Sequence, residues 1–384
     1  MDLITCQYLA NQGWSADLPT ALDSESTLLL AFAAPRFGVE TAPLHELAQA
    51  FPRSVLVGCS TSGEINGSAV QDDSISLAVA RFAHGGLRRA VTPLAGAEDS
   101  FQAGQRLADQ LGASSPDGAL RAVFVLSDGL NVNGSLLVAG LVRQLPAGVV
   151  VTGGLAGDGP RFEHTWILDR GAPATRHVCA VGLYGDRLRV GHGCDGGWSD
   201  FWPERRITRA VGNVLYELDG KHALDLYQTY LGDRAQGLPG TALLFPLSVR
   251  RDESGADTLV RTILGVDEAQ RSLTFAGDIP EGGLARLMRA NTDKLVDSAG
   301  RAARSAAAGV AGAGDALIVS VSCVGRRLVL GERTDEEVET VQDSAPPRAA
   351  HVGFYSYGEI SPALPGRASD LHNQTMTVTV FSEA

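Results

Sequence analysis

Two short stretches of the sequence place a carboxylate directly after a glycine. Residues 57–65 read VGCSTSGEI, and residues 352–360 read VGFYSYGEI. Glycine permits a close approach of a ligand or of backbone, and Glu64 and Glu359 could hold an ammonium or guanidinium group. The alternative is structural, because each carboxylate could instead accept hydrogen bonds from the next turn of its own backbone.

A third stretch, VVVTGGLAGDG at residues 149–159, ends in Gly-Asp where the other two have Gly-Glu. Hydroxyl and aromatic side chains accompany these corners and suit a small-molecule pocket, although the tyrosines could equally pack in the core. The predicted ligand-binding residues of the three stretches are Cys59, Ser60, Thr61, Gly63, Glu64, Gly154, Asp158, Tyr355, Ser356, Tyr357, Gly358 and Glu359.

His372 and Asn373 extend this set, because they stand in LHNQT just before the last strand-like segment. A single histidine is more often a hydrogen-bonded structural residue than a ligand. No HExxH or HxxxH spacing occurs, so a metal hydrolase is not indicated.

Cys59 and Ser60 stand where a catalytic nucleophile could lie, but the sequence places no base beside them. A buried, inert cysteine is the commoner role for such a residue. GGLAGDG lacks the Gly-Lys-Ser/Thr ending of a phosphate loop and does not form GxGxxG in register, and no GxSxG elbow occurs. A hydrolase using Cys59 or Ser60 is therefore a minor alternative, and no catalytic residue is assigned.

The elements that must position these residues repeat along the chain. A short apolar run typical of a buried strand is followed by a helical pattern, the glycine-acid stretch and an alternating strand. The first copy uses residues 27–34, 39–51 and 74–82, the last uses 316–323, 326–342 and 375–381, and a middle copy uses 122–129, 134–145 and 162–168. This duplication predicts an α/β to α+β fold of two related lobes, with mixed, mostly buried sheets covered by helices.

The segment between the copies differs in pattern. It contains an extended piece to Leu218, a helix that Gly232 should close, and an Ala-rich helix over 291–310 that Asn291 or Thr292 could cap. We predict the domain junction in this segment, with one domain over residues 1–215 and a second over 216–384.

Composition and charge limit the classes of binding partner and the cellular compartment that we expect. The formal charge is −12 and no long Lys/Arg run occurs, which argues against nucleic acid or an anionic membrane surface. The N-terminus lacks the pattern of a signal peptide, and no apolar run is long enough for a membrane helix. Five widely spaced cysteines suggest neither disulfides nor a zinc ribbon, so we expect a cytoplasmic protein.

Taken together, these motifs resemble the FIST family, a sensory module of bacterial signalling proteins. GCSTSGEI, GGLAGDG and residues 207–232 resemble its N-terminal domain, expected over 1–215. SCVGRRLVLGERTDEEVE, GFYSYGEI and LHNQTMTVTVF resemble its C-terminal domain, expected over 216–384. The resemblance implies a non-enzymatic sensor of small ligands such as amino acids, which would signal through a partner protein.

Some stand-alone members of this family bind haem, sense nitric oxide and act on a histidine kinase. For this chain the resemblance therefore adds haem as an alternative, and no cofactor is assigned. Haem would be held without a CxxCH motif, with His372 as the candidate metal ligand. The leading hypothesis remains a small ligand, an amino acid or amine, bound in a cleft between two related halves. A pure protein-interaction scaffold is a further alternative.

Overall fold

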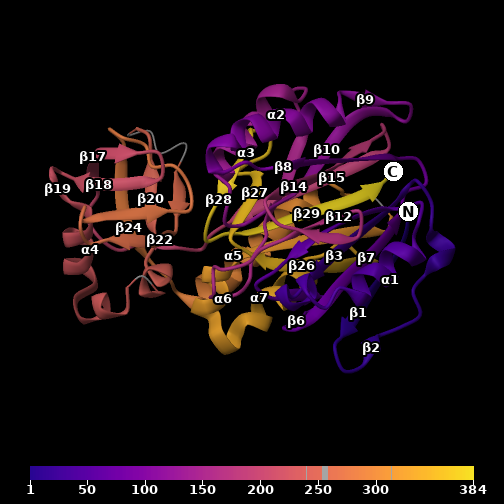
Figure 1. The fold of residues 1–384 in the computed structure, drawn as a ribbon, viewed down its shortest axis with the longest axis horizontal. Coiled ribbons are helices and arrows are strands. Elements are labelled where there is room, and N and C mark those ends of the chain that lie inside the picture. Colours follow the sequence, from indigo (N-terminus) through magenta and orange to yellow (C-terminus); the bar gives the residue numbers. More distant parts are fainter. Residues whose placement is uncertain (239, 253–257, 313) are drawn as a thin grey trace.

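Three mixed sheets enclose one apolar core, and a fourth sheet lies at one end of the molecule (Figure 1). The computed structural model describes residues 1–238, 240–252, 258–312 and 314–384. We call the part built from the three sheets the three-sheet core. The predicted fold class, with mixed buried sheets covered by helices and a repeated strand–helix–strand unit, is confirmed.

Each sheet of the three-sheet core is built on one copy of the repeat. Within a copy, the first two strands are parallel and the last strand pairs antiparallel with the first. The first copy has β3 (Thr27–Ala33), α1 (Ala42–Ala50), β4 (Val55–Ser60) and β7 (Ser74–Arg81). The middle copy has β10 (Gly118–Ser127), α3 (Gly134–Gln144), β11 (Val150–Leu155) and β14 (His177–Tyr184), so the prediction of its last strand at residues 162–168 was wrong. The third has β25 (Ala316–Cys323), α6 (Val324–Leu330), α7 (Thr334–Asp343), β26 (Ala349–Ser356) and β29 (Met376–Glu383).

Every copy also lends strands to its neighbours, which interlocks the three. The hairpin that follows each glycine-acid corner joins the sheet of another copy. The hairpin of β5 (Glu64–Asn66) and β6 (Ala69–Gln71) pairs with β26, and that of β12 (Ile167–Asp169) and β13 (Ala172–Ala174) pairs with β4. The hairpin of β27 (Gly358–Pro362) and β28 (Ser369–His372) pairs with β11. At the opposite edges, β8 (Gly86–Pro93) joins β14, β15 (Leu188–Asp195) joins β29, and β1 (Asp2–Leu9) joins β7. The N-terminal strand thus lies in the sheet of the first copy, where it takes the place that β8 and β15 take in the other two sheets. The short β2 (Gly13–Trp14) pairs with β1, and β9 (Ser114–Ser115) pairs with the start of β10.

The inner faces of the three sheets share one apolar cluster. Phe32 and Phe354 lie with ring centroids 4.6 Å apart, and Phe124 contacts both Phe32 and Phe381. Helices cover the outer faces, with α2 (Ser100–Leu111) and α3 on one sheet and α5 (Thr292–Ala308) and α7 on another. Central strands such as β3 and β25 are therefore buried on both faces, which is why they read as continuous apolar runs.

One glycine in each copy permits the close pairing of the two parallel strands. A Cβ atom on Gly58, Gly153 or Gly353 would lie 2.2, 1.9 or 2.2 Å from a backbone carbonyl oxygen of the neighbouring strand. Every other residue type would force the strands apart at this point. The three glycines stand at equivalent positions of the parallel pairs, opposite Ala31, Val125 and Ser320.

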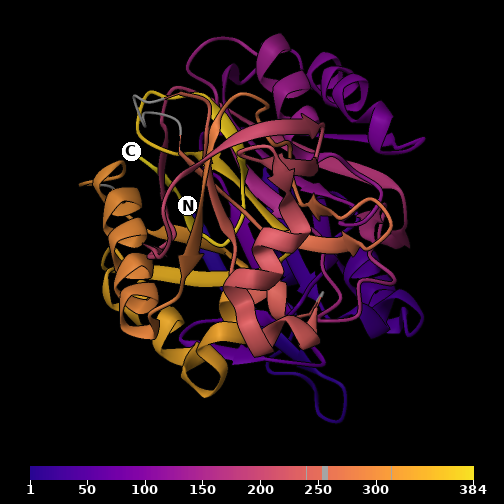
Figure 2. The same cartoon turned by 90° about the vertical axis from the view of Figure 1, so that its left-hand side faces the viewer.

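The fourth sheet, which we call the inserted sheet, leaves the core after β15 and returns to it at α5. Its strands are β16 (Ser199–Asp200), β17 (Arg205–Val211), β18 (Val214–Leu218), β19 (Lys221–His222), β20 (Leu247–Arg250), β21 (Leu259–Arg261), β22 (Ile263–Asp267), β23 (Ser272–Phe275) and β24 (Leu284–Arg289). The helix predicted to end at Gly232 is α4 (Ala223–Leu231), and Asn291 caps α5 as expected. Figure 2 views the molecule from this end, with the inserted sheet in front of the core. The predicted junction at residues 215 and 216 lies inside β18, and it stays a prediction.

No helix in the described part of the chain is long and apolar enough to cross a membrane.

Candidate functional site

The three glycine-acid corners meet one another at the carboxyl ends of the parallel strands. Ser62 N–H donates to the Tyr355 carbonyl oxygen at 2.8 Å, Gly157 N–H donates to Ser60 at 2.9 Å, and Tyr357 N–H donates to Leu155 at 3.3 Å. These bonds run from each copy to the next and close a ring. The structure therefore brings the corners together, as the repeated sequence suggested.

At the corners of the first and third copies, the two glutamates are buried and bound within their own units. Glu64 accepts hydrogen bonds from Ser74 N–H at 3.0 Å, from Ser74 O–H at 2.9 Å and from the Thr61 hydroxyl. Glu359 accepts them from Thr375 N–H at 3.1 Å, Thr375 O–H at 2.9 Å and Ser356 O–H at 2.7 Å. Burial raises the pKa of each carboxyl to about 8. Both glutamates thus make the local structural contacts that were the alternative to ligand binding.

Asp158 fills the same structural role in the middle copy. It accepts backbone N–H bonds from Phe162 at 2.9 Å, Glu163 at 3.0 Å and His164 at 2.9 Å, and it also accepts the Tyr357 hydroxyl. The Phe162 ring stacks on Tyr357 with centroids 4.3 Å apart. The tyrosine of the third copy is therefore fixed by the corner of the middle copy.

The geometry gives no support to a nucleophile at Cys59 or Ser60. Cys59 is fully buried, and burial raises the pKa of its thiol well above the usual value. The Ser60 hydroxyl oxygen accepts Trp166 N–H at 3.1 Å. Within the described residues no hydrogen bond joins either side chain to a base.

A cleft of about 1200 Å³ lies between the inserted sheet and the three-sheet core. One face of α3, the ends of β20 and β21, residues 278–281 and the segment from Ala363 to His372 line it. We call it the junction cleft. Of the predicted binding residues only His372 lines it in the described structure, whereas the corners pack against each other beside it.

The His372 side chain is buried and contacts the protein's own backbone. Its Nε2 lies 2.9 Å from the Ser361 carbonyl oxygen, and burial lowers its pKa. Haem would require an apolar pocket at its axial ligand, whereas this cleft is lined by several charged side chains. The residues present therefore do not fit an axial haem ligand at His372. The described residues also hold no cluster of His, Cys, Asp or Glu that could bind a metal.

Asn373 is completely buried, and neither its Nδ2 nor its Oδ1 finds a hydrogen-bond partner among the described residues. The next residue, Gln374, donates from Nε2 to the carbonyl of Leu243 in the inserted sheet region at 3.0 Å. The LHNQT segment thus lies at the junction between core and insert, although Asn373 itself does not line the cleft in the described residues.

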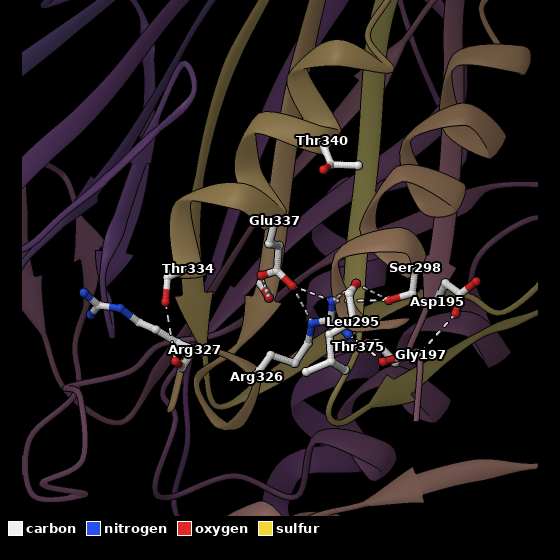
Figure 3. A network of polar contacts seen from close by, with 12 residues as sticks. Asp195, Gly197, Leu295, Ser298, Arg326, Arg327, Thr334, Glu337, Thr340 and Thr375 are labelled. Carbon is white, nitrogen blue, oxygen red and sulfur yellow. Dashed lines mark hydrogen bonds and ion pairs between the residues drawn. The ribbon is translucent and has the colours of Figure 1, made fainter. Parts of the chain in front are cut away.

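Arg326 is the centre of a buried polar network that the sequence did not reveal (Figure 3). It forms a fully buried ion pair with Glu337, which also accepts Ser322 O–H at 2.9 Å and Tyr355 O–H at 3.0 Å. Its two terminal nitrogens donate to the carbonyls of Gly196 at 2.6 Å and Leu295 at 2.9 Å. Gly196 precedes the inserted sheet and Leu295 follows it, so one guanidinium holds both connections of the insert.

Arg327, the next residue on α6, reaches the corner of the first copy instead. It donates to the Ser62 carbonyl at 2.6 Å and forms an ion pair with Asp72 at 2.8 Å. The sequence feature that could have pointed to both residues is the Arg-Arg doublet inside the apolar run VGRRLVLG. Arg261, which lines the junction cleft, was also missed, because an isolated arginine in a strand pattern gives no signal.

Two family models match consecutive parts of the chain. A family model described as the FIST N domain matches residues 27–221, and one described as the FIST C domain matches residues 223–362. An uncharacterized protein of Methanocaldococcus jannaschii, MJ1623, is 25% identical over 279 residues, which is 66% of this chain and 52% of that protein. The chain therefore spans about half the length of this curated relative.

Among solved structures, a cyanuric acid hydrolase from A. caulinodans aligns over 99% of both chains at 9% identity with a TM-score of 0.34. A likeness at this level carries no argument about activity.

Proposed function

Because this chain belongs to the FIST family, we propose that it is a sensor that binds a small molecule in the junction cleft and passes the signal to a partner protein. FIST domains are associated with sensory signal transduction. That the ligand is a small molecule, that it binds in this cleft and that a partner protein receives the signal are each proposed here.

The observation that carries this proposal is the position of the cleft, between two bodies that are joined by adjacent connections. Its walls come from the inserted sheet on one side and from α3 and residues 363–372 on the other. A ligand that contacts both walls would favour one arrangement of the two bodies over others. Such differential binding is what a sensor needs in order to shift a conformational equilibrium.

Helix α6 offers a route from the cleft to the rest of the molecule. Arg326 holds the carbonyls at both connections of the insert, while Arg327 holds the corner at Ser62. A displacement of the insert would therefore act on one turn of helix that also contacts the first copy. A partner protein that binds across both bodies would read that displacement.

The test combines a ligand screen with a variant that fills the cleft. Amino acids, amines and organic acids are screened by thermal shift against the wild type and against Ala139→Trp. Ala139 is an exposed residue of α3 on the cleft wall. We expect at least one compound to raise Tm of the wild type, and Ala139→Trp to abolish that shift.

Ala308→Trp is the matched control, because Ala308 is an exposed helical alanine at the end of α5, away from the cleft. Equal ligand shifts in the wild type and in both variants would contradict the cleft as the binding site. A visible spectrum recorded after incubation with haem tests the cofactor separately, and we expect no Soret band that depends on His372.

A further inference from the structure

The most unusual side chain of the junction cleft is Arg261. It is only 3% exposed, yet every acceptor that it contacts in the described part of the chain is neutral. It donates to the Leu371 carbonyl at 2.9 Å, to the Asp278 carbonyl at 3.2 Å and to the Ser135 hydroxyl at 3.5 Å. No carboxylate of the described residues lies within 4.0 Å of its guanidinium.

The acidic side chains nearest to Arg261 are bound elsewhere. The Asp278 carboxylate accepts Asn133 Nδ2–H at 3.0 Å, and the Asp370 carboxylate accepts Leu371 N–H at 2.7 Å. Both favour the charged form of Arg261 at longer range, while burial lowers its pKa. A guanidinium carries five N–H donors and stays protonated in proteins. Three are used here, which leaves two for a ligand.

A buried cation without a paired anion is unfavourable, and proteins normally pair such groups. The surroundings of Arg261 point to an anion that arrives from solution. Arg143, Arg250, Arg251 and Arg367 line the same cleft. Among the described lining residues these five arginines, Arg261 included, stand against three acids, Asp278, Glu281 and Asp370, and Arg250 is paired with Glu204 outside the lining. The described walls of the cleft thus carry more arginines than acids, in a chain whose formal charge is −12.

Helix α3 reinforces this polarity. Its first turn, which includes Ser135, faces the cleft next to the Arg261 guanidinium. The N-terminal end of a helix carries partial positive charge and favours anions. A small oxyanion between Arg261 and this end would be attracted by both groups.

We propose that the junction cleft receives a small anion whose carboxylate or phosphate oxygens pair with Arg261. This inference rests on the proposed role of the cleft as the ligand site, and it assigns the chemical class of the ligand. The competing explanation is that Arg261 is a structural strut that ties β21 to the end of β28 through Leu371.

The first experiment measures binding to the full chain by thermal shift and calorimetry. The probes are succinate, inorganic phosphate, neutral succinamide and the amine putrescine, all at equal ionic strength set with sodium chloride. We expect succinate or phosphate to raise Tm of the wild type, and the stronger of the two identifies the source of the oxyanion. Arg261→Gln should weaken that Kd at least about tenfold, because a charge-assisted pair is lost.

The second experiment does not depend on the folding of an Arg261 variant. Ser135→Glu places a carboxylate next to the guanidinium, where it should occupy the anion site from within. We expect it to raise Tm without ligand and to remove the response to succinate or phosphate. Ser135→Gln, which adds the same bulk without charge, should keep that response.

Three outcomes would overturn the anion site. The anions could bind Arg261→Gln and Ser135→Glu as tightly as the wild type, sodium chloride alone could produce the same shift, or the anions could fail to bind the wild type. If a neutral or cationic compound binds the wild type but not Ala139→Trp, the cleft remains the ligand site and only the anion assignment fails. If no compound depends on Ala139, the proposed function fails as well.

Discussion

Glu64 and Glu359 illustrate how a buried carboxyl can be retained without an ion pair. Each lies at the start of a hairpin, fully enclosed, with three hydrogen bonds from its own unit. Burial favours the neutral acid over the carboxylate, and the raised pKa of about 8 expresses that preference. The raised pKa therefore favours protonated, hydrogen-bonded side chains at neutral pH over carboxylates that are free to bind an amine.

The raised pKa values predict a specific pH dependence of stability. The unfolded chain releases these protons near the ordinary value of 4.5, whereas the folded chain keeps them to about 8. The contribution to stability is thus complete below about pH 4.5 and is lost as the pH rises through 8. Glu64→Gln and Glu359→Gln should each remove this loss, on the order of 2–4 kcal/mol per site between pH 5 and pH 8.5.

Urea unfolding at several pH values measures this effect. Glutamine mimics the protonated acid, since its amide can still donate on one side and accept on the other. Glu25→Gln is the control, because the Glu25 side chain is 87% exposed. If the glutamine variants at positions 64 and 359 show the same pH slope as the wild type, the two acids are ionised in the folded protein.

At the scale of elements, α6 is the short helix on which the geometry of the insert depends. It places Arg326 inward, against Glu337 of α7 and the two connections of the insert. It places Arg327 towards the neighbouring copy, where its partner Asp72 is 68% exposed. Arg326 and Arg327 thus stabilise two different junctions, and only the junction at Arg326 is shielded from water.

This difference predicts unequal effects of two similar substitutions. Arg326→Met leaves the buried Glu337 carboxylate without its cationic partner and should lower the free energy of unfolding by about 3–5 kcal/mol. Arg327→Met breaks a pair that is open to solvent and should cost about 1 kcal/mol or less. Chemical denaturation of both variants measures the difference.

The double variant Arg326→Met with Glu337→Leu separates charge from packing. It should recover part of the lost stability, because neither buried charge then remains unpaired. If the double variant is as unstable as the sum of its two single changes, the ion pair is not the source of the effect.

At the scale of the whole molecule, the three-sheet core is closed in a circle. Strand β1 at the N-terminus occupies, against β7, the place that β8 and β15 occupy in the other two sheets. The Met1 amino group lies 3.5 Å from the Glu383 carboxylate, and both chain ends lie side by side in Figure 1. The chain could therefore start at another connection between strands of the three-sheet core.

A circular permutant tests this closure. Residues 384 and 1 are joined by a short glycine-rich linker, and the chain is opened between Pro116 and Asp117, which lie in an exposed turn. We expect a cooperative unfolding transition within about 5 °C of the wild-type Tm, because breaks at exposed turns are well tolerated. Opening the chain within β10, between Phe124 and Val125, is the destabilising control. Loss of cooperative folding in the first permutant would show that the order of the copies matters beyond their contacts.

The sequence by itself determined the repeated unit, its strands and helices, and the family. Period-2 apolar runs, helical stripes and the recurring Gly-acid phrase are local properties, so they can be found in one chain without coordinates. Asn291 as the cap of α5 and Gly232 as the end of α4 were predictable for the same reason. The glycines of the parallel strands were visible in the phrases as well, although their contact with a neighbouring carbonyl was not.

Only the tertiary structure decided where the candidate site lies. Glu64, Asp158 and Glu359 bind within the core, and the cleft forms instead where the inserted sheet meets α3 and residues 363–372. Arg261 becomes notable only through its burial beside Ser135 and Leu371, which are 126 and 110 positions away in the chain. Such contacts depend on how three interlocked copies and one insert pack together, and no local pattern encodes that arrangement.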